Sequence, residues 1–389
     1  MPTDHPYPED RNPPAKGRVI QLSTVHAWDD NRICRKISRS LAEDDYEVIL
    51  VARAAKSKDS IPPRDVDLHV LPNPRGRIRR GLSSLGIWRR IRRLRPEVVH
   101  FHDPELLPTG LILKFLGHRV IYDVHEHVPD DIMEKEWIPT PFRGMVSAIM
   151  NVVERVASSR FDAIFAVTPN IAKRFRPDRT TLLRNFPRSE EIIARESETQ
   201  IDRSGVSNLI FVGGMTPARG IREMVTAVGL ASDPNVRLDI LGTCDDPSLN
   251  QWLERNAQES RSSLHGWVEK SSSTVLLRKA RAGMLLYLPS PAHVEALPTK
   301  MFEYMAAGIP VIASDFPLWR SIIDKHRCGI LVDPSNPQEI AHAIDAIYKD
   351  PAEASAMGAR GRQAIESEFN WQAEAESMMA VYDHLCHTR

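Results

Sequence analysis

The segment from Glu295 to Gly308 combines two carboxylates and a lysine at spacings that suit a phosphorylated ligand. Pro298 favours the first turn of a helix, and Gly308 favours its carboxyl-terminal cap. Lys300 and Glu303, three residues apart, then share one helical face. The free amide groups of a helix amino terminus favour a phosphate, to which Lys300 adds a full positive charge. The carboxylate of Glu303 can accept hydrogen bonds from a ribose diol. The same spacing also fits an exposed ion pair, so both interpretations stay open.

Histidines and acids gather after two apolar runs in the first half of the chain. His102 and Asp103 follow one run, and His125 and His127 follow the next. These four side chains could be read as a metal site, but their spacing matches no standard zinc arrangement. We therefore expect no functional metal ion. His100 stands inside its apolar run and is expected to be buried.

Two aspartates, Asp29 and Asp30, follow the first apolar run of the chain. A carboxylate in such a loop could orient a substrate hydroxyl group and eventually accept its proton. It could equally cap the helix that begins near Arg32. The residues alone do not separate the two roles.

Short runs rich in Val and Ile alternate with segments of helical period along most of the chain. The runs are apolar on both faces, as expected for strands of a parallel sheet that helices cover. They begin at residues 18, 47, 68, 97, 119 and 162, and again, after a polar stretch, at 209, 237, 282, 309 and 329. This order predicts an α/β protein with two doubly wound Rossmann-like domains that face a cleft.

The pattern also predicts where the domains begin and end. We expect a flexible tail at 1–17, a first domain at 18–188, a linker at 189–206, a second domain at 207–370 and a final helix at 371–389. The final helix carries an apolar stripe at helical spacing and is expected to pack back on the first domain.

The composition excludes several classes of protein. At 389 residues, with 42% hydrophobic and 26% charged residues, the chain is globular and too long for one core. The 51 basic and 51 acidic residues cancel, so no general attraction for nucleic acid is expected. The four cysteines form no Cys-x-x-Cys pair, and no run resembles a signal peptide or a membrane span. We therefore expect a cytoplasmic protein.

Several motifs in order resemble the group 1 glycosyltransferases (family 4, retaining, GT-B fold). The segment from Glu295 through Glu303 to residue 312 resembles the signature of that family. Further similar stretches lie at 29–33, 101–108, 122–126, 167–170 and 328–337, so that the resemblance covers nearly the whole chain. With these neighbours, the ligand interpretation of 295–303 becomes stronger than the ion-pair interpretation.

The resemblance implies a role for each matching position. Glu303 would hold the ribose of a nucleotide-sugar donor, Lys300 its diphosphate, and Leu297 and Pro298 would complete the donor segment. Glu295 and His125 would contact the transferred sugar, and we place them with Asp29 as the catalytic candidates. Asp30, His102 and Asp103 are the candidates on the acceptor side.

One position of the resembled donor site is unusual in this chain. The turn at 212–220 resembles a family turn that usually carries an arginine after its first glycine and a lysine before its last. Here Gly214 follows Gly213, and Arg219 precedes the last glycine. Arg219 suits a bidentate phosphate contact, whereas Gly214 supplies no charge. Either Arg219 and Lys300 suffice, or a cation such as Arg222 or Arg184 compensates.

A basic stretch from Arg75 to Arg95 holds nine arginines among interleaved leucine, isoleucine and tryptophan residues. Such a segment could lie on an anionic membrane surface, and it could equally be a solvated helix face. Because no nucleic-acid recognition module accompanies it, we expect no nucleic-acid partner. A membrane contact would place the protein peripherally on the inner face of the plasma membrane.

The sequence thus predicts transfer of a hexose from a nucleotide-diphosphate donor to an acceptor hydroxyl group, with retention and without a metal or other cofactor. The expected acceptor is a saccharide or a lipid-linked saccharide of cell-surface polysaccharide or glycolipid assembly. Two alternatives stay open: a nucleotide-sugar epimerase of the same fold, and a non-catalytic partner of a polysaccharide-synthesis complex.

Overall fold

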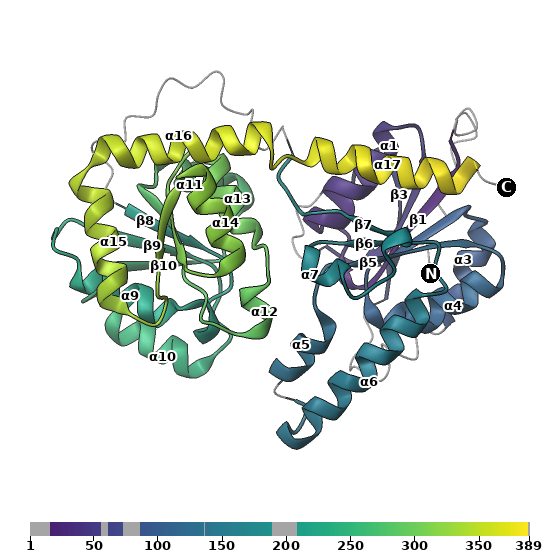
Figure 1. Ribbon diagram of the computed structural model, residues 1–389, viewed down its shortest axis with the longest axis horizontal. Helices are drawn as coiled ribbons and strands as arrows, with labels where there is room; N and C mark the ends of the chain where they lie inside the picture. Colours follow the sequence, from purple (N-terminus) through teal and green to yellow (C-terminus); the bar gives the residue numbers. More distant parts are fainter. Residues whose placement is uncertain (1–15, 56–60, 73–85, 136, 189–207, 388–389) are drawn as a thin grey trace. The chain divides into compact units, whose positions relative to one another are not determined.

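The computed structural model describes residues 16–55, 61–72, 86–135, 137–188 and 208–387 of the chain (Figure 1). These residues form two compact units. Unit 1 comprises Met1–Asn185 and Ala373–Arg389, and unit 2 comprises Phe186–Gln372. The predicted linker and most of the predicted tail lie outside the described residues.

Unit 1 is built on a sheet whose described strands all pair in parallel, in the order β3-β2-β1-β4-β5-β6-β7. The strands are β1 (Arg18–Ala27), β2 (Glu47–Arg53), β3 (Val66–Leu71), β4 (Val98–Phe101), β5 (Arg119–Val124), β6 (Ala163–Ala166) and β7 (Thr180–Leu182). The central strands are buried on both faces, as their continuous apolar runs require. The chain order reverses direction across the sheet between β1 and β4.

Helices cover the sheet of unit 1. They are η1 (Asn31–Ser38), α1 (Arg39–Glu43), α3 (Trp88–Leu94), η2 (Pro104–Leu106), α4 (Leu107–Phe115), α5 (Val128–Glu134), α6 (Thr140–Ser158), α7 (Pro169–Ala172) and η3 (Pro177–Arg179). Their apolar faces join the strands in one core that includes Phe101, Tyr122 and Phe161.

Unit 2 repeats this plan with a smaller parallel sheet, ordered β10-β9-β8-β11-β12-β13 in the described residues. The strands are β8 (Asn208–Val212), β9 (Arg237–Leu241), β10 (Ser262–Gly266), β11 (Ala282–Leu285), β12 (Val311–Ser314) and β13 (Gly329–Val332). The helices are η4 (Pro217–Arg219), α9 (Ile221–Leu230), α10 (Pro247–Asn256), α11 (Lys270–Lys279), α12 (Pro291–Val294), α13 (Thr299–Ala306), α14 (Pro317–His326), α15 (Pro337–Lys349) and α16 (Pro351–Ser367). Both faces of the sheet carry an apolar core.

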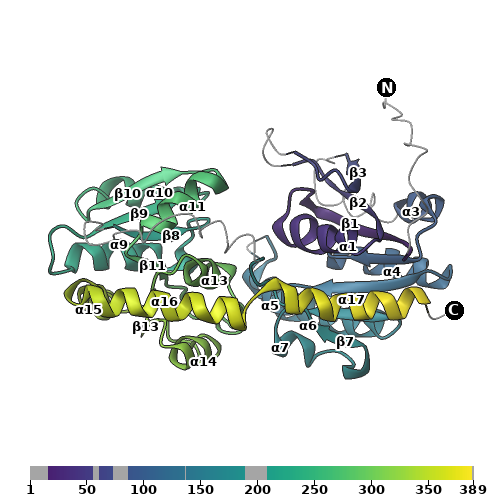
Figure 2. The ribbon, with the colours of Figure 1, turned by 90° about the horizontal axis from the view of Figure 1, so that it is seen from above.

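The last helix, α17 (Trp371–His387), belongs almost entirely to unit 1, although the preceding helix α16 belongs to unit 2. Figure 2 shows α17 along the strands of unit 1. Tyr382 of α17 is fully buried and accepts a 2.7 Å hydrogen bond from the Nε2 atom of Gln21 on β1. The expected two-domain α/β fold with a returning carboxyl-terminal helix is confirmed.

The described part of the basic stretch is α3 and its flanks, whereas Arg75, Arg77, Arg79 and Arg80 lie outside the described residues. Ile87 and Ile91 are buried in the core of unit 1, and Trp88 and Leu94 pack against it. The apolar side of α3 therefore stabilises the fold and is not available to insert into a bilayer. In the described residues, no helix is long and apolar enough to cross a membrane.

Candidate functional site

The predicted donor residues of unit 2 lie beside the point where the strand order of the sheet reverses. Strand β8, the first strand of the unit, pairs with β9 on one side and with β11 on the other. Loops that leave the carboxyl ends of β8 and β11 therefore diverge, and open α/β sheets bind ligands at such a point. The amide of Leu288, after β11, donates a 2.8 Å hydrogen bond to the carbonyl of Ala218, after β8, which joins the two loops.

Glycines allow the turn after β8 to approach its neighbour very closely. Gly213 has a φ of 151°, and Gly242, in the turn after β9, has a φ of 150°. A Cβ atom on Gly242 would lie 1.8 Å from the carbonyl oxygen of Gly213, a distance that no side chain can occupy. Gly214 is exposed and has no side chain to cover the turn. The backbone at this position is thus open to a ligand, as Gly-rich phosphate loops require.

Arg219 is held over the glycine turn. One terminal nitrogen of its guanidinium donates a 3.0 Å hydrogen bond to the carbonyl of Gly214, and the group lies 5.6 Å from the ring centre of Tyr287. Burial raises the pKa of the Tyr287 hydroxyl, Arg219 lowers it and Glu303 raises it. The net shift of the Tyr287 pKa is upward. Arg219 and Glu303 thus both act on the same hydroxyl group. Although they are 84 positions apart in the sequence, both lie within electrostatic range of Tyr287.

The segment around α13 meets the glycine turn through a buried tyrosine. Pro298 occupies the cap position, and α13 begins at Thr299, one residue later than the sequence predicts. The Tyr304 hydroxyl group accepts a 3.1 Å hydrogen bond from the amide of Val212, the last residue of β8. This contact fixes α13 against the start of the turn. Leu297 packs on the core of unit 2, while Glu295 ends α12 and is exposed.

Lys300 and Glu303 form an ion pair with 2.6 Å between Nζ and the Glu303 carboxylate. Their side chains are 26% and 32% exposed, so solvent screens the attraction, and such helical pairs contribute only about 0.2–0.5 kcal/mol. A ligand that carried a diphosphate and a diol could therefore separate them at little cost. The ion pair and the ligand site, which the sequence left as alternatives, are compatible in this geometry.

Both candidates for a compensating cation have partners of their own within the described residues. The Arg222 guanidinium lies 5.5 Å from the ring centre of Trp252, on α10. Arg184 belongs to unit 1, where its side chain and its amide bind the carboxylate of Glu374 on α17. Arg219 and Lys300 therefore stay the predicted cations of the donor segment.

In unit 1, the carboxyl ends of β1 and β4 hold a histidine–aspartate pair that the sequence did not single out. The Nδ1 atom of His26 lies 3.0 Å from a carboxylate oxygen of Asp103. Burial by itself raises the pKa of Asp103, but hydrogen bonds from His26, Thr24 and Ser23 outweigh it and bring that pKa to about 2. Burial lowers the pKa of His26, and Asp103 more than offsets this, so the net shift is upward. His26 is partly exposed, whereas Asp103 is buried.

This pair has the form of an oriented acid–base group. The buried carboxylate fixes the imidazole ring, and the ring keeps an edge that is partly accessible. No sequence signal marked it, because the two residues lie 77 positions apart and His26 stands inside a strand. Asp103 was predicted on the acceptor side, and in the structure its buried carboxylate binds His26.

His125, at the end of β5, lies beside this pair. Its ring packs edge-on against His26 with 5.0 Å between the ring centres. The side chain is half-buried, and the Nδ1 atom is shielded from solvent without a hydrogen-bond partner. Burial lowers the pKa of His125, which keeps the imidazole neutral at pH 7. The fold thus gathers two histidines and one aspartate at the carboxyl edge of the sheet.

The two aspartates after β1 have different local surroundings. Asp30 caps η1, where its carboxylate accepts hydrogen bonds from the amides of Arg32 and Ile33 at 2.8 and 3.0 Å. Its structural role is therefore the helix cap that the sequence left as an alternative. Asp29 is half-buried in the same loop.

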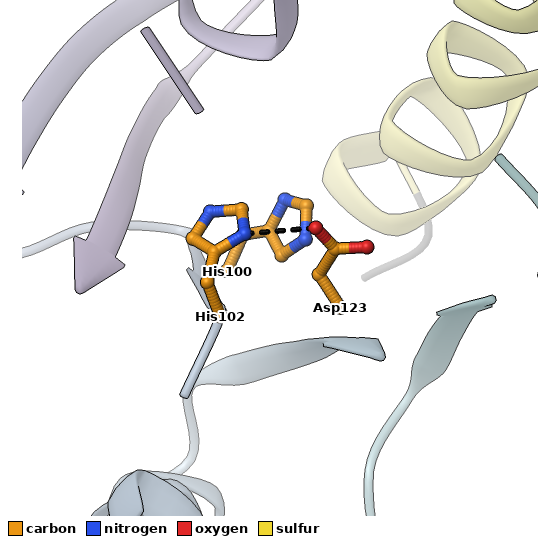
Figure 3. Close-up of side chains that lie close together, drawn as sticks. All are labelled: His100, His102 and Asp123. Atoms are coloured by element: carbon orange, nitrogen blue, oxygen red, sulfur yellow. Dashed lines mark hydrogen bonds and ion pairs between the residues drawn. The ribbon is translucent and has the colours of Figure 1, made fainter. Parts of the chain in front are cut away.

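His102 is a core residue, and the structure does not support its predicted position on the acceptor side. Its side chain is fully buried, with Nδ1 2.9 Å from Asp123 and Nε2 3.0 Å from Gln21 (Figure 3). Arg32 binds Asp123 through two nitrogens at 2.6 and 2.7 Å. Burial raises the pKa of Asp123, but Arg32 and then His102 lower it well below its usual range. The strand-end histidine therefore completes an internal network instead of facing a substrate.

In the described part of the chain, His100, His102 and Asp123 have ligand atoms within 4.8 Å of one another, which is close enough for a metal ion (Figure 3). Hydrogen bonds already use both nitrogens of His102 and both oxygens of Asp123. A metal ion would also have to displace the guanidinium of Arg32. The donor set fits a hydrogen-bonded network better than a cation site.

Two family models match the chain. The model described as Glycosyltransferase Family 4 matches residues 31–183, which lie in unit 1. The model described as Glycosyl transferases group 1 matches residues 196–364, which lie in unit 2 and include the donor segment.

Curated relatives and solved structures agree with these matches. The chain is 23% identical to a glycogen synthase of Mycobacterium tuberculosis over 74% of this chain and 69% of that protein. It is 26% identical to the α-maltose-1-phosphate synthase of Mycolicibacterium smegmatis over 59% and 65%.

Among solved structures, sucrose-phosphate synthase of Thermosynechococcus elongatus has a TM-score of 0.74 at 17% identity, over 95% of this chain and 99% of that one. HepE of Anabaena in complex with UDP and glucose has a TM-score of 0.71 at 14% identity, over 95% and 100%. At these identities the similarity shows a shared fold.

Proposed function

Because the chain belongs to the group 1 glycosyltransferases, we propose that it moves a hexose from a nucleotide-diphosphate donor to an acceptor hydroxyl group with retention of the anomeric configuration. The proposal is supported by three contacts: Arg219 binds the carbonyl of Gly214, Lys300 pairs with Glu303 on α13, and Tyr304 of α13 binds the amide of Val212 at the start of the glycine turn. Two cations, an open backbone and a helix amino terminus suit a diphosphate, and the carboxylate suits the ribose.

The proposed chemistry relies on stabilisation of the leaving group. As the bond between the sugar and the diphosphate breaks, Arg219, Lys300 and the amino terminus of α13 stabilise the charge that develops on the phosphate oxygen. An oxocarbenium-like sugar remains. The acceptor hydroxyl group attacks it from the face that the diphosphate leaves, which retains the configuration, and gives its proton to the departing phosphate oxygen. No metal ion or other cofactor is required in this scheme, because cations of the chain neutralise the diphosphate.

The remaining site residues have proposed roles that follow from their chemistry. Glu295 and His125 hold the transferred sugar, and the neutral imidazole of His125 suits a hydroxyl group as its partner. Asp29 orients the acceptor hydroxyl group. Asp103 contributes indirectly, because it orients His26 and has its own oxygens engaged.

The donor base and sugar can be identified by ligand-induced stabilisation. A donor present at about 100 times its Kd adds about 2.7 kcal/mol to the free energy of unfolding. Thermal unfolding would be measured with UDP, GDP and ADP, and then with their sugars. UDP is the first choice, since the structures of Anabaena HepE contain UDP and UDP-glucose. If none of these nucleotides raises the melting temperature, the donor site is assigned wrongly.

Turnover then separates the proposal from its alternatives. A transferase releases nucleotide diphosphate only slowly until a saccharide or lipid-linked acceptor of surface-polysaccharide assembly is added, whereas an epimerase converts the donor fully without an acceptor. A non-catalytic binding partner shows neither activity. Glu303→Ala should abolish turnover, with Glu366→Ala, on the exposed surface of α16, as the matched control.

Two predictions from the sequence concern the location of the protein and its contact with a membrane. A cytoplasmic position and an anionic-membrane contact through the Arg75–Arg95 stretch stay predictions. Co-sedimentation with vesicles of neutral and of anionic lipid tests the contact, since equal binding to both would contradict it.

A further inference from the structure

Helix α6 of unit 1 carries a long apolar face that the fold leaves exposed. Its side chains are 45–62% exposed, although all of them are large hydrophobic groups: Phe142 53%, Met145 56%, Ile149 56%, Val152 59%, Val153 45% and Val156 62%. Figure 1 shows α6 at the margin of unit 1, next to α5. Contiguous apolar patches of this kind are rare on soluble monomers and mark contact surfaces.

The exposed face is not the side by which α6 joins its own core. The opposite side of the helix is anchored by Glu154, Ala157 and Ser158, which are buried. Glu154 accepts a 2.8 Å hydrogen bond from the hydroxyl group of Tyr122 and forms a buried ion pair with Arg174. Unit 1 therefore fixes α6 firmly and in one orientation, with its apolar face outward.

The spacing of the exposed residues is that of a helix-pairing seam. From Phe142 the steps along the helix are three, four, three and four residues, which end at Val156. Hydrophobic residues repeated every 3.5 positions form the a and d sites of paired helices. Gly144 and Ala148 lie exposed beside this row, and a Cβ atom on Gly144 would meet nothing within 4 Å. Small residues there leave a groove into which the ridge of another helix can fit.

The charges of this region favour a protein partner over an anionic bilayer. Helix α6 carries two bases, Arg143 and Arg155, and one acid, Glu154, which is buried. The guanidinium groups of both arginines donate to backbone carbonyls of unit 1, so α6 lacks the cluster of about four to eight Lys and Arg that recognises anionic lipid. The charged residue next to the seam, Arg155, donates through Nε to the carbonyl of Arg174.

The size of the patch fits one side of a two-fold interface. The six half-exposed side chains form an apolar surface on the order of several hundred Å², a large part of the ~800 Å² per partner of a standard interface. A closed dimer needs one surface that matches itself, and a row of hydrophobic side chains beside a groove meets this requirement. We propose that α6 is a homodimer interface, at which α6 of one chain packs against α6 of a second copy. This inference is independent of the sugar-transfer proposal.

Sedimentation equilibrium of the full chain at micromolar concentrations tests the interface. The wild type should have twice the 43.9 kDa mass of one chain. Ile149→Glu and, separately, Val152→Glu place a charge in the seam of both copies and should weaken the dimer at least about 100-fold. Leu230→Glu is the matched control, because Leu230 on α9 is 48% exposed and lies in unit 2. That variant should stay dimeric.

Two further measurements keep the test decisive. Circular dichroism and melting temperatures establish that the variants fold, which the half-exposed positions of Ile149 and Val152 favour. Hydrogen exchange of the backbone amides in α6 should slow as the concentration of wild-type protein rises. The same exchange should not depend on concentration in the Ile149→Glu and Val152→Glu variants. A monomeric wild type overturns the proposal, as does a dimer that survives both substitutions. A monomer that binds vesicles of phosphatidylcholine and phosphatidylglycerol through α6 overturns it in favour of a lipid surface.

Discussion

Lys300→Ala, compared with Arg222→Ala, tests whether the phosphate-binding groups are assigned correctly. Lys300 pairs with Glu303 at 2.6 Å, and both side chains are partly exposed. The substitution therefore removes about 0.2–0.5 kcal/mol of folding stability. Arg222 lies over Trp252, a contact that contributes about 0.5–1 kcal/mol to stability at an exposed site. Both variants should fold, with melting temperatures close to that of the wild type.

The two substitutions should differ strongly in catalysis. Loss of one group that stabilises charge in a transition state typically costs about 2.7–4 kcal/mol, or about 100- to 1,000-fold in kcat. Because Gly214 supplies no cation, Lys300 should lie at the upper end of that range. Arg222 has its guanidinium on Trp252, so Arg222→Ala should change kcat/KM by less than about threefold, or ~0.7 kcal/mol.

The assay is the steady-state rate of nucleotide release with the donor that stabilises the protein best. Ratios of kcat/KM convert directly to lost transition-state stabilisation. Lys300→Arg should recover part of the rate, because it restores the charge with a different shape. Equal losses for Lys300→Ala and Arg222→Ala would refute the assignment, and so would a loss below about tenfold (~1.4 kcal/mol) for Lys300→Ala.

Two further predictions concern the stability of unit 1, and a third concerns nucleotide binding by unit 2. Tyr382→Phe should lower the free energy of unfolding by about 1–3 kcal/mol in urea titrations, since it leaves buried polar groups without a partner; an unchanged midpoint would contradict a structural role for α17. Burial lowers the pKa of His100 in the folded state. As the pH falls through ~6.5, the unfolded state therefore binds a proton at His100 before the folded state does, and the contribution of neutral His100 to stability is complete only above that pH. Below that pH, stability should fall by up to ~1.4 kcal/mol per pH unit, and His100→Asn should flatten the curve relative to the wild type. Gly242→Ala should weaken nucleotide binding through its clash with Gly213, whereas Gly266→Ala, with a φ of 64° and open space, should show only backbone strain; similar binding by both variants would argue against the close approach of the two turns.

The fold could be predicted from sequence to the extent that its strands are buried. The central strands of both units are apolar runs, because helices cover both of their faces. Two edge strands, β7 and β10, were missed. β10 is largely exposed and β7 is half-buried throughout, so neither needs the continuous apolar run by which a buried strand is recognised.

The donor segment could be predicted because its chemistry is local. Pro298, Lys300 and Glu303 lie within two helical turns, and the spacing of a helix alone puts the last two on one face. Their position relative to Arg219 depends on the sheet, which sets β8 beside β11. The Tyr304 hydroxyl group, which fixes α13 to the end of β8, carries no sequence signal.

The polar cluster of unit 1 was harder to predict, because its members come from different strands. Consecutive strand-end residues can face opposite sides of a sheet, and the sequence does not tell which side is enclosed. His102 therefore looked like a substrate contact and proved to be a core residue, bound to Asp123. His26 carried no sequence signal, and in the structure it is paired with Asp103.

By itself, the sequence determined the fold class, the family and the helical pairing of Lys300 with Glu303, since each depends on patterns within a few consecutive turns or strands. The tertiary structure alone decided which polar groups meet across the sheet and which helix faces stay uncovered. Hydrogen bonds between separate elements join residues distant in the chain, as Gln21 on β1 and Tyr382 on α17 illustrate. The outward apolar face of α6 likewise follows from the groups that anchor the other side of that helix. Such contacts depend on the register and packing of whole elements, which no single stretch of the sequence specifies.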